Sequence, residues 1–413
     1  MLGDRGGTVD RGGTVVRTST RRVGGVVMAA AALLLLATGC TPTNQGSSAA
    51  KAAVDAVQEP AAPQAVIDVQ PESASTDVAP GEPVTVTVTD GTLTEVTLAD
   101  ARSDRVLDGT MGADGRSWTS AAPLKVAKHY RLRATAADAD GRVSERAAYF
   151  ATVKPRKELE TYISPLDGQN VGVGMPVVVR FSSPVKNRAA VEQALTVDTS
   201  KPIIGSWSWT SDEEVHFRPK QYWPAYTDVK VKVDLAGVDA GRGVWGLKDR
   251  TVKFSTGSSI VSVVDVDKRT LTVRRNGKVT RVIPVTTGKD GFLTRNGIKV
   301  VLEKHQLKVM DATTIGISPG DPEYYRLDVP YAMRVTWSGE FVHAAPWSVG
   351  SQGRANVSHG CVGMSPSNAI WLYNQSSVGD VVEVVGSPRT LEPGNGYTDW
   401  NVSWADWTAG SAL

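Results

Sequence analysis

The chain has 413 residues, of which 45 are lysine or arginine and 43 are aspartate or glutamate, so its formal net charge at pH 7 is only +2. This balance excludes the strongly basic groove of a nucleic-acid-binding protein, and we expect no nucleic-acid partner. The 40 glycines and 22 prolines divide the sequence into short segments, which favours turn-rich β-structure over long helices. A chain of this length predicts roughly two to four domains.

Residues 1–39 have the pattern of an export signal. Arginines, among them Arg17 and Arg22, precede an apolar segment at 26–37. That segment is too short to span a bilayer, but its length is typical of the apolar part of a signal peptide. We therefore expect an exported protein from which this segment is removed.

Cys40 follows the small residues Thr38 and Gly39, in a pattern similar to the lipobox of bacterial lipoproteins. Acylation there would hold the protein at the outer face of the cell membrane, where it would act in the cell wall or periplasmic space. An ordinary secretory signal with a chance cysteine is one alternative, and a disulfide with Cys361, the other cysteine, is a second. Residues 40–65, rich in Ala, Ser, Gln and Pro, predict a disordered tether.

Residues 66–155 predict a first β-sandwich. Valine and threonine alternate over 83–89, as in a strand with one buried face. Asp-Gly pairs, which favour tight turns, separate this run from its neighbours. Short alternating strands joined by such turns indicate an immunoglobulin-like domain. Further strands are predicted at 94–98, 130–134 and 147–153.

Residues 156–257 predict a second immunoglobulin-like sandwich. One short helix is expected among its strands, at 187–195. Four tryptophans are expected to fill the core of this unit rather than to form a ligand cage, because large aromatic side chains usually pack. These tryptophans are Trp207, Trp209, Trp223 and Trp245, and the strands are predicted at 176–181, 214–217, 228–233 and 251–254.

Residues 258–386 predict a third strand-rich unit. A helix is expected at 365–373, with Ser365 as its N-cap and Pro366 at its first helical position. The C-terminal extension, residues 387–413, contains three closely spaced tryptophans and is expected to fold back onto the third unit. The clearest strands of this unit are predicted at 270–274, 278–283 and 381–385.

The segment Ser358-His359-Gly360-Cys361 contains the candidate nucleophile. A thiol needs a nearby base and a donor for the developing oxyanion before it catalyses acyl transfer. His343 lies eighteen residues before the cysteine, and histidine is the usual base near neutral pH. Two other roles remain open: an inert buried thiol, or a metal site of the two histidines and the cysteine, for which no fourth ligand lies at a suitable spacing. We expect no metal and no cofactor.

At these residues the third unit resembles the catalytic domain of bacterial L,D-transpeptidases, and the chain from residue 66 onward is similar to the mycobacterial type. The family motif is a histidine, a spacer and Ser/Thr-His-Gly-Cys, followed by a hydrophobic residue and usually asparagine. Here the motif begins at His343, and Gly363 stands where asparagine is usual. The segments 343–353, 325–329 and 399–401 strengthen the match.

The resemblance implies two immunoglobulin-like β-sandwich domains followed by a β-rich catalytic domain. It also implies that Cys361 attacks the bond before the terminal D-alanine of a peptidoglycan stem tetrapeptide, releases D-alanine and forms a thioester. An amine of a neighbouring stem would then complete a 3→3 cross-link, and β-lactams of the carbapenem class would acylate the same thiol. Two alternatives remain: an L,D-carboxypeptidase or cell-wall cysteine hydrolase, in which water takes the thioester, and a non-catalytic cell-wall binding protein.

We expect His343 to be the general base, held by a main-chain carbonyl such as that of Ala344 and assisted by Ser338. The N–H groups of Gly360 and Cys361 are the expected oxyanion donors, because glycine lets the main chain approach a bound carbonyl.

The other candidates surround this pair. His359 is expected to line the site or to lend its N–H to the oxyanion, and the Tyr325 hydroxyl is a third donor. Met310 and Trp347 are expected to line the mouth, under a mobile hairpin at about 300–330 that sheds water from the thioester. The expected substrate-binding residues are Tyr325, Met310, Trp347, Ser358, Ser338 and Gly363.

Overall fold

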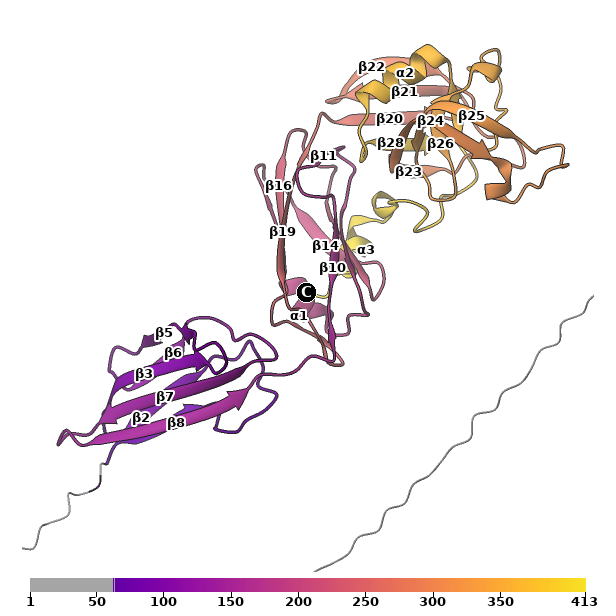
Figure 1. Ribbon diagram of the computed structural model, residues 1–413. Coiled ribbons are helices and arrows are strands. Elements are labelled where there is room, and N and C mark those ends of the chain that lie inside the picture. Colours follow the sequence, from indigo (N-terminus) through magenta and orange to yellow (C-terminus); the bar gives the residue numbers. More distant parts are fainter. Residues whose placement is uncertain (1–61, 63) are drawn as a thin grey trace, which may run out of the picture. The chain divides into compact units, whose positions relative to one another are not determined.

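The computed structural model describes residue 62 and residues 64–413 of the chain (Figure 1). The predicted signal segment, Cys40 and most of the predicted tether at 40–65 lie outside the described residues. The described part is mainly β, as predicted, with a few short helices. None of the helices in this part is long and apolar enough to cross a membrane.

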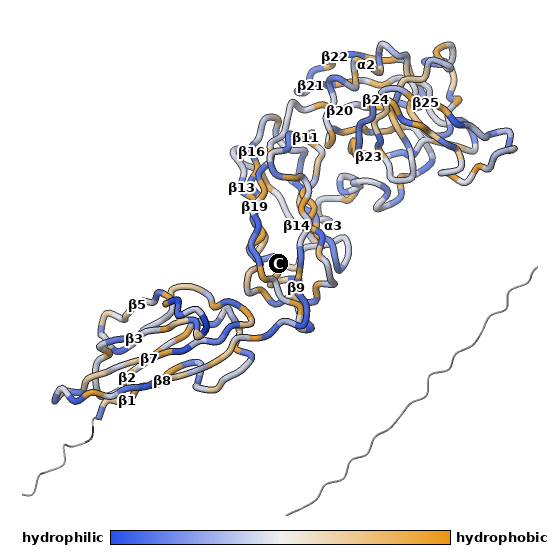
Figure 2. The backbone as a smooth tube through the Cα atoms, in the orientation of Figure 1, coloured by the Kyte–Doolittle hydropathy of each residue, from blue (hydrophilic) through white to orange (hydrophobic). Residues whose placement is uncertain are grey.

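The first sandwich consists of two four-stranded sheets. Buried and exposed side chains alternate most regularly in β7 (His129–Ala137), and Figure 2 shows hydropathy changing along the strands. The inward side chains, such as Val86, Leu98 and Leu132, form one hydrophobic core. One sheet has the order β1 (Val66–Gln70), β2 (Thr85–Thr89), β6 (Ser117–Ser120), β5 (Gly109–Met111); the other has the order β4 (Val106–Leu107), β3 (Thr92–Asp100), β7, β8 (Val143–Ala151).

The second sandwich has its own core of buried valines and aromatic residues. Trp207, Trp209 and Trp223 are buried in it, as predicted, whereas Trp245 is only half-buried and lies outside it, so that part of the prediction was wrong. Trp245 belongs to a short three-stranded ribbon, in which its neighbour Val244, and not Trp245, packs against the core. That ribbon has the order β17 (Asp239–Gly241), β18 (Val244–Trp245), β9 (Lys157–Glu158).

The two main sheets of this sandwich each have four strands, and the predicted helix is α1 (Arg188–Gln193). One sheet has the order β10 (Thr161–Ser164), β12 (Val177–Phe181), β15 (Glu214–Pro219), β14 (Gly205–Trp209); the other has the order β11 (Asn170–Val171), β19 (Asp249–Thr256), β16 (Asp228–Asp234), β13 (Leu195–Thr199).

The third unit packs two sheets and one helix around a common core. Val264 and Leu271 of the first sheet share this core with Met333 and Val342 of the second and with Leu372 of the helix. The first sheet has the order β22 (Lys278–Pro284), β21 (Thr270–Arg275), β20 (Ile260–Asp265), β28 (Val381–Val385), β23 (Gly297–Val300); the second has the order β24 (Glu303–Asp311), β25 (Arg326–Arg334), β26 (Phe341–Ala344), β27 (Val362–Met364).

Three helical segments accompany these sheets: η1 (Ala312–Ile315), η2 (Pro346–Ser348) and the predicted helix, α2 (Pro366–Gln375). Pro366 is the first residue of α2 and Ser365 occupies its N-cap position, as predicted. The Ser365 side chain makes no capping hydrogen bond, however; its hydroxyl lies 3.4 Å from that of Ser367.

The C-terminal extension contacts both the second and the third unit. Asn401, in η3 (Asp399–Asn401), accepts a hydrogen bond from the N–H of Ile298 in β23 at 2.7 Å, so this part does fold onto the third unit. The expectation was wrong for the following helix, α3 (Trp404–Ala409), because the indole N–H of Trp407 donates to the carbonyl of Ser206 in the second sandwich at 3.0 Å.

Arg218 of the second sandwich explains this docking. Its guanidinium carbon lies 5.0, 5.3 and 4.6 Å from the ring centres of Trp400, Trp404 and Trp407. Attraction between a cation and aromatic faces therefore draws the tryptophan-rich segment to the second sandwich.

Candidate active site

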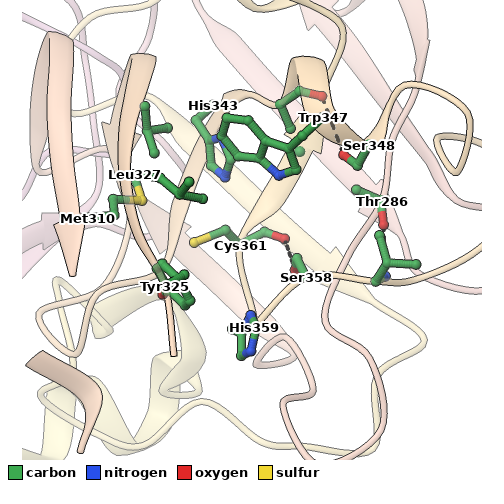
Figure 3. A pocket seen from close by; sticks show the side chains of 14 residues that line it. Thr286, Met310, Tyr325, Leu327, His343, Trp347, Ser348, Ser358, His359 and Cys361 are labelled. Carbon is green, nitrogen blue, oxygen red and sulfur yellow. Dashed lines mark hydrogen bonds between the residues drawn. The ribbon is translucent and has the colours of Figure 1, made fainter. Parts of the chain in front are cut away.

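Strand pairing brings the candidate base and nucleophile together. Strands β26 and β27 are parallel neighbours, and His343 is paired in register with Gly363. Paired residues share one face of a sheet, as do residues two apart on one strand. His343 and Gly363 therefore face the same side. Cys361, which comes just before β27, lines the same pocket, and Figure 3 shows the imidazole and the thiol in it.

This pocket is a cavity of about 220 Å³. Eight of the predicted site residues line it, and it also includes apolar and hydroxyl side chains that were not among the predicted site residues. The predicted residues are Met310, Tyr325, His343, Trp347, Ser358, His359, Cys361 and Gly363; the others are Thr286, Leu327, Val329, Ala345, Ser348 and Val357.

Cys361 sits at the end of the loop that leads into β27 and is 9% exposed. Burial raises the pKa of its thiol to about 12, and the nearby carboxylate of Glu340 acts in the same direction, although the N–H of Phe341 lowers it. The thiol is therefore protonated at neutral pH and needs a base to become a nucleophile.

His343, in the same pocket, is the candidate for this base. Its Nδ1 donates to the main-chain carbonyl of Ala344 at 2.7 Å, which confirms the predicted contact. Because a carbonyl only accepts, the proton is on Nδ1 and the lone pair of Nε2 is free. Burial lowers the pKa of His343 to about 4, so the ring is neutral at neutral pH. The indole of Trp347 stacks on it, with ring centres 5.9 Å apart.

Two hydrogen bonds to one hydroxyl shape the loop before the nucleophile. The Oγ of Ser358 donates to the carbonyl of Cys361 at 2.6 Å and accepts from the N–H of Gly360 at 3.1 Å. Gly360 has a φ of +115°, a conformation that side-chain-bearing residues rarely adopt. Since its N–H is already used within the loop, the geometry does not support Gly360 as an oxyanion donor.

His359 faces a cluster that the sequence did not reveal. Its Nε2 lies 2.8 Å from Oε2 of Glu323, and that oxygen is 2.6 Å from Nζ of Lys289. The rings of Phe292 and Tyr325 lie on the same imidazole, with centres 4.5 and 4.9 Å away. Charged residues in loops are common and carry no motif, so no local signal pointed to Glu323.

Tyr325 and Ser338 differ in how well they fit their expected roles. Burial raises the pKa of the Tyr325 phenol to about 12, so its hydroxyl stays protonated and able to donate. Ser338 does not line the pocket; its hydroxyl accepts from the side-chain amide of Asn395 at 2.9 Å and lies 3.2 Å from the hydroxyl of Thr336. The extension thus engages Ser338, and the geometry does not support a direct role beside His343.

Gly363 is tightly enclosed. Its N–H donates to the carbonyl of Thr286, whose own N–H donates to the carbonyl of Gly363, both at 2.9 Å. A Cβ at this glycine would lie 3.0 Å from Cβ of Ala345 and 3.1 Å from Cγ2 of Thr286. This structure therefore has little room for the asparagine that is usual in the family.

A buried ion-pair cluster lies beside the nucleophile loop. Glu340 accepts from Nζ of Lys299 at 2.5 Å and from the guanidinium of Arg295 at 3.1 Å. Lys299 is 1% exposed, and burial lowers its pKa although Glu340 opposes this effect. Among residue 62 and residues 64–413, no group of three or more His, Cys, Asp or Glu side chains is placed to hold a metal ion.

The chain is similar to known families and proteins over most of its length. The family profile of the bacterial Ig domain matches residues 75–239, and that of the L,D-transpeptidase catalytic domain matches residues 259–384. L,D-transpeptidase 2 of Mycobacterium tuberculosis is 37% identical over 402 residues, which cover 96% of this chain and 97% of that protein. L,D-transpeptidase 5 of the same species is 36% identical over 83% of this chain and 76% of its own length.

Among solved structures, LdtMt1 in complex with imipenem is 41% identical, covers 56% of this chain and all of its own length, and has a TM-score of 0.49. L,D-transpeptidase 3 from Mycobacterium tuberculosis in complex with a faropenem-derived adduct is 34% identical, covers 55% of this chain and 97% of its own, and has a TM-score of 0.46. The match to L,D-transpeptidase 2 extends over nearly the whole length of both proteins. The chain therefore belongs to the L,D-transpeptidase family.

Proposed function

We propose that this L,D-transpeptidase cross-links peptidoglycan stem peptides, with Cys361 as its nucleophile and His343 as its general base. The observation on which the proposal rests is the neutral imidazole, its Nε2 lone pair free, in the same pocket as the only thiol of the described residues. A base held in one tautomer by a carbonyl is the arrangement that nucleophilic catalysis by cysteine requires.

In the first half-reaction, Nε2 of His343 takes the thiol proton and Sγ of Cys361 attacks the carbonyl before the terminal D-alanine. The tetrahedral intermediate collapses, the C–N bond breaks, and His343 returns the proton to the leaving amine of D-alanine. The N–H of Cys361 and the hydroxyl of Tyr325 are the proposed donors to the oxyanion. The enzyme is left as a thioester.

In the second half-reaction, a side-chain amine of a neighbouring stem attacks the thioester. His343 accepts the proton from the attacking amine, the C–S bond breaks, the sulfur is reprotonated and a 3→3 cross-link is released. Water competes with the amine for the same thioester. Because Met310, Leu327 and Val329 make the pocket apolar, we propose cross-linking rather than the carboxypeptidase reaction as the main outcome.

We also propose that carbapenems acylate the protein. Their strained amide carbonyl is open to the same thiol, and the acyl-enzyme forms by opening of the ring without a separate leaving group. The third candidate function, a non-catalytic wall-binding protein, does not require a base beside the thiol.

Intact mass spectrometry tests this assignment. The mature protein is incubated with a tetrapeptide donor, with and without an amine acceptor, and separately with a carbapenem; Cys361→Ala is the control. We expect loss of D-alanine, an acceptor-dependent dimer and a carbapenem adduct on wild type only. A folded wild-type protein that shows neither adduct nor turnover would contradict the proposal.

We propose that the protein acts outside the cytoplasm and is anchored by a lipid on Cys40. The lipobox-like sequence supports this location, as does the position of peptidoglycan outside the membrane. In this proposal residues 66–155 and 156–257 are spacer domains and 258–386 the catalytic domain. Labelling of cells with a fatty-acid analogue should mark wild type and not Cys40→Ser; equal labelling of both would contradict the anchor.

A further inference from the structure

Glu323 links two segments that border the pocket. It lies between β24 and β25, on the connection that contains η1, and its carboxylate reaches the loop of the nucleophile. Oε2 of Glu323 is 2.8 Å from Nε2 of His359 and 2.6 Å from Nζ of Lys289. We call these three residues, Glu323, His359 and Lys289, the clasp.

Other contacts also hold His359 and its loop. Phe292 and Tyr325 contact the ring of His359, and the N–H of Lys289 donates to the carbonyl of Ser358 at 3.0 Å. The rings of Phe292 and Tyr325 and the bonded loop thus limit the movement of His359. Glu323 supplies the hydrogen bond that connects His359 to the β24–β25 connection. Tyr325, which lines the pocket, is only two residues from Glu323.

Charge strengthens the contact of Glu323 with His359 and Lys289. The ammonium of Lys289 and the imidazole of His359 hold the pKa of Glu323 below its usual range, so the carboxylate is ionised at neutral pH. A charge-assisted hydrogen bond is stronger than a neutral one. The Glu323 side chain is still 38% exposed, so solvent weakens the pair.

We propose that Glu323 is a positioning residue that, through His359 and Lys289, holds the β24–β25 connection over the thioester and so favours the amine acceptor over water. This inference rests on the proposed function, since it concerns the fate of the thioester. Glu323 itself touches neither the nucleophile nor the base; it acts by keeping water from the acyl group after D-alanine has left.

The test compares Glu323→Gln, which keeps the shape and removes the charge, with Glu323→Asp and Lys289→Met. Asp328→Asn is the matched control, because Asp328 is exposed on β25 of the same hairpin and the charge change is the same. Donor tetrapeptide and amine acceptor are supplied, and the cross-linked dimer and hydrolysed tripeptide are quantified. We expect the hydrolysed fraction to rise about two- to fivefold in Glu323→Gln and Lys289→Met, the size expected for a partly exposed ion pair.

Glu323→Asp should restore part of the wild-type ratio, and Asp328→Asn should leave it unchanged. Hydrogen exchange of residues 316–325, measured on the free enzyme, gives a readout that needs no turnover; it should be faster in Glu323→Gln. The inference is overturned if active wild type and Glu323→Gln give the same ratio of hydrolysed to cross-linked product. It is also overturned if Asp328→Asn changes this ratio as much as Glu323→Gln does. A wild type that forms neither product contradicts the proposed function instead, and unchanged exchange in Glu323→Gln then overturns the clasp independently.

Discussion

The Oγ of Ser358 donates a 2.6 Å hydrogen bond to the carbonyl of Cys361 and closes a turn of four residues. The same oxygen accepts from the N–H of Gly360, so one hydroxyl orients the main chain on both sides of the turn. The serine of the Ser-His-Gly-Cys motif therefore has a structural role. Its hydroxyl sets the direction in which the thiol and the N–H of Cys361 point.

Replacing Ser358 by alanine removes both bonds. We expect the free energy of unfolding to fall by about 1–2 kcal/mol, as for the loss of one or two partly buried hydrogen bonds. Acylation by a carbapenem should slow by about tenfold or more, because a reacting group that loses its orientation loses rate steeply. Ser358→Thr keeps the hydroxyl and should stay close to wild type. Equal acylation rates for the alanine variant and wild type would refute this role.

The rate of acylation should depend on pH through His343. Burial lowers its pKa to about 4, so the base is neutral, and competent, above that value. We expect the acylation rate to be flat between about pH 5 and 9 and to fall below that range, since only neutral imidazole accepts the thiol proton. Stopped-flow measurement with a carbapenem gives the profile. If the midpoint of the pH profile lies near 6.5, the ordinary pKa of histidine, burial does not lower the pKa of His343.

The free energy of unfolding should also depend on pH through His343. The folded-state pKa of His343 lies below its unfolded value of 6.5, so the unfolded chain binds more protons between these two values. Its contribution is fully present above pH 6.5 and is lost as pH falls toward 4. The loss amounts to about 3 kcal/mol, the free energy that corresponds to the difference between these two pKa values. Denaturant titrations of wild type and His343→Gln at both ends of this window measure it.

His216 should give the opposite pH dependence. Burial alone lowers its pKa, but Asp399 at 2.9 Å from Nδ1 and Glu214 at 2.7 Å from Nε2 raise it to about 9. Because both partners only accept, both ring nitrogens carry protons. The stabilising contribution is therefore fully present below pH 6.5 and is lost as pH rises through about 9.

This prediction concerns the docking of the extension, since Asp399 lies in η3. We expect wild type to lose about 3 kcal/mol between pH 6.5 and 10 relative to His216→Gln. Thermal unfolding of both proteins across that range provides the measurement. Parallel curves for the two proteins would mean that the charge of His216 does not help to hold the extension.

Gly363→Asn tests the position at which this chain departs from the family pattern. Cβ of the new residue would lie 3.0 Å from Cβ of Ala345, so the neighbours must move, and we expect a loss of about 1–3 kcal/mol in unfolding free energy. The side chain would also narrow the pocket and slow acylation by a carbapenem. The double variant Gly363→Asn/Ala345→Gly removes the closest contact and should recover part of the stability. Additive losses in the double variant would contradict the packing argument.

Much of the fold could be predicted because its signal is local. The alternation of valine and threonine at 83–89 predicts a strand without knowledge of its partner, and β2 lies within that range. Pro366 likewise marks the start of α2. Trp245 was predicted wrongly because hydrophobicity alone does not tell which of two neighbouring strand residues packs against the core, and here Val244 does so.

The candidate site likewise has features that could be predicted from the sequence and features that could not. The motif at Cys361 and the histidine before it are read directly from the order of residues, and the carbonyl of Ala344 is a neighbour of His343 in the chain. Ser338 was misplaced because its partner, Asn395, is far away in sequence. Glu323 was missed because nothing in its surroundings distinguishes it from other loop carboxylates.

The sequence by itself determined the β-rich class and the family of the catalytic unit, and it singled out Cys361 and His343 as the candidate thiol and base. These properties depend on side-chain type and short-range periodicity, which any stretch of chain carries with it. Only the tertiary structure decided that His343 pairs with Gly363 across two parallel strands, that Glu323 meets His359, and that α3 docks on the second sandwich. The reason is that strand register and docking depend on the packing of many distant residues at once, and no single segment specifies the sum of those contacts.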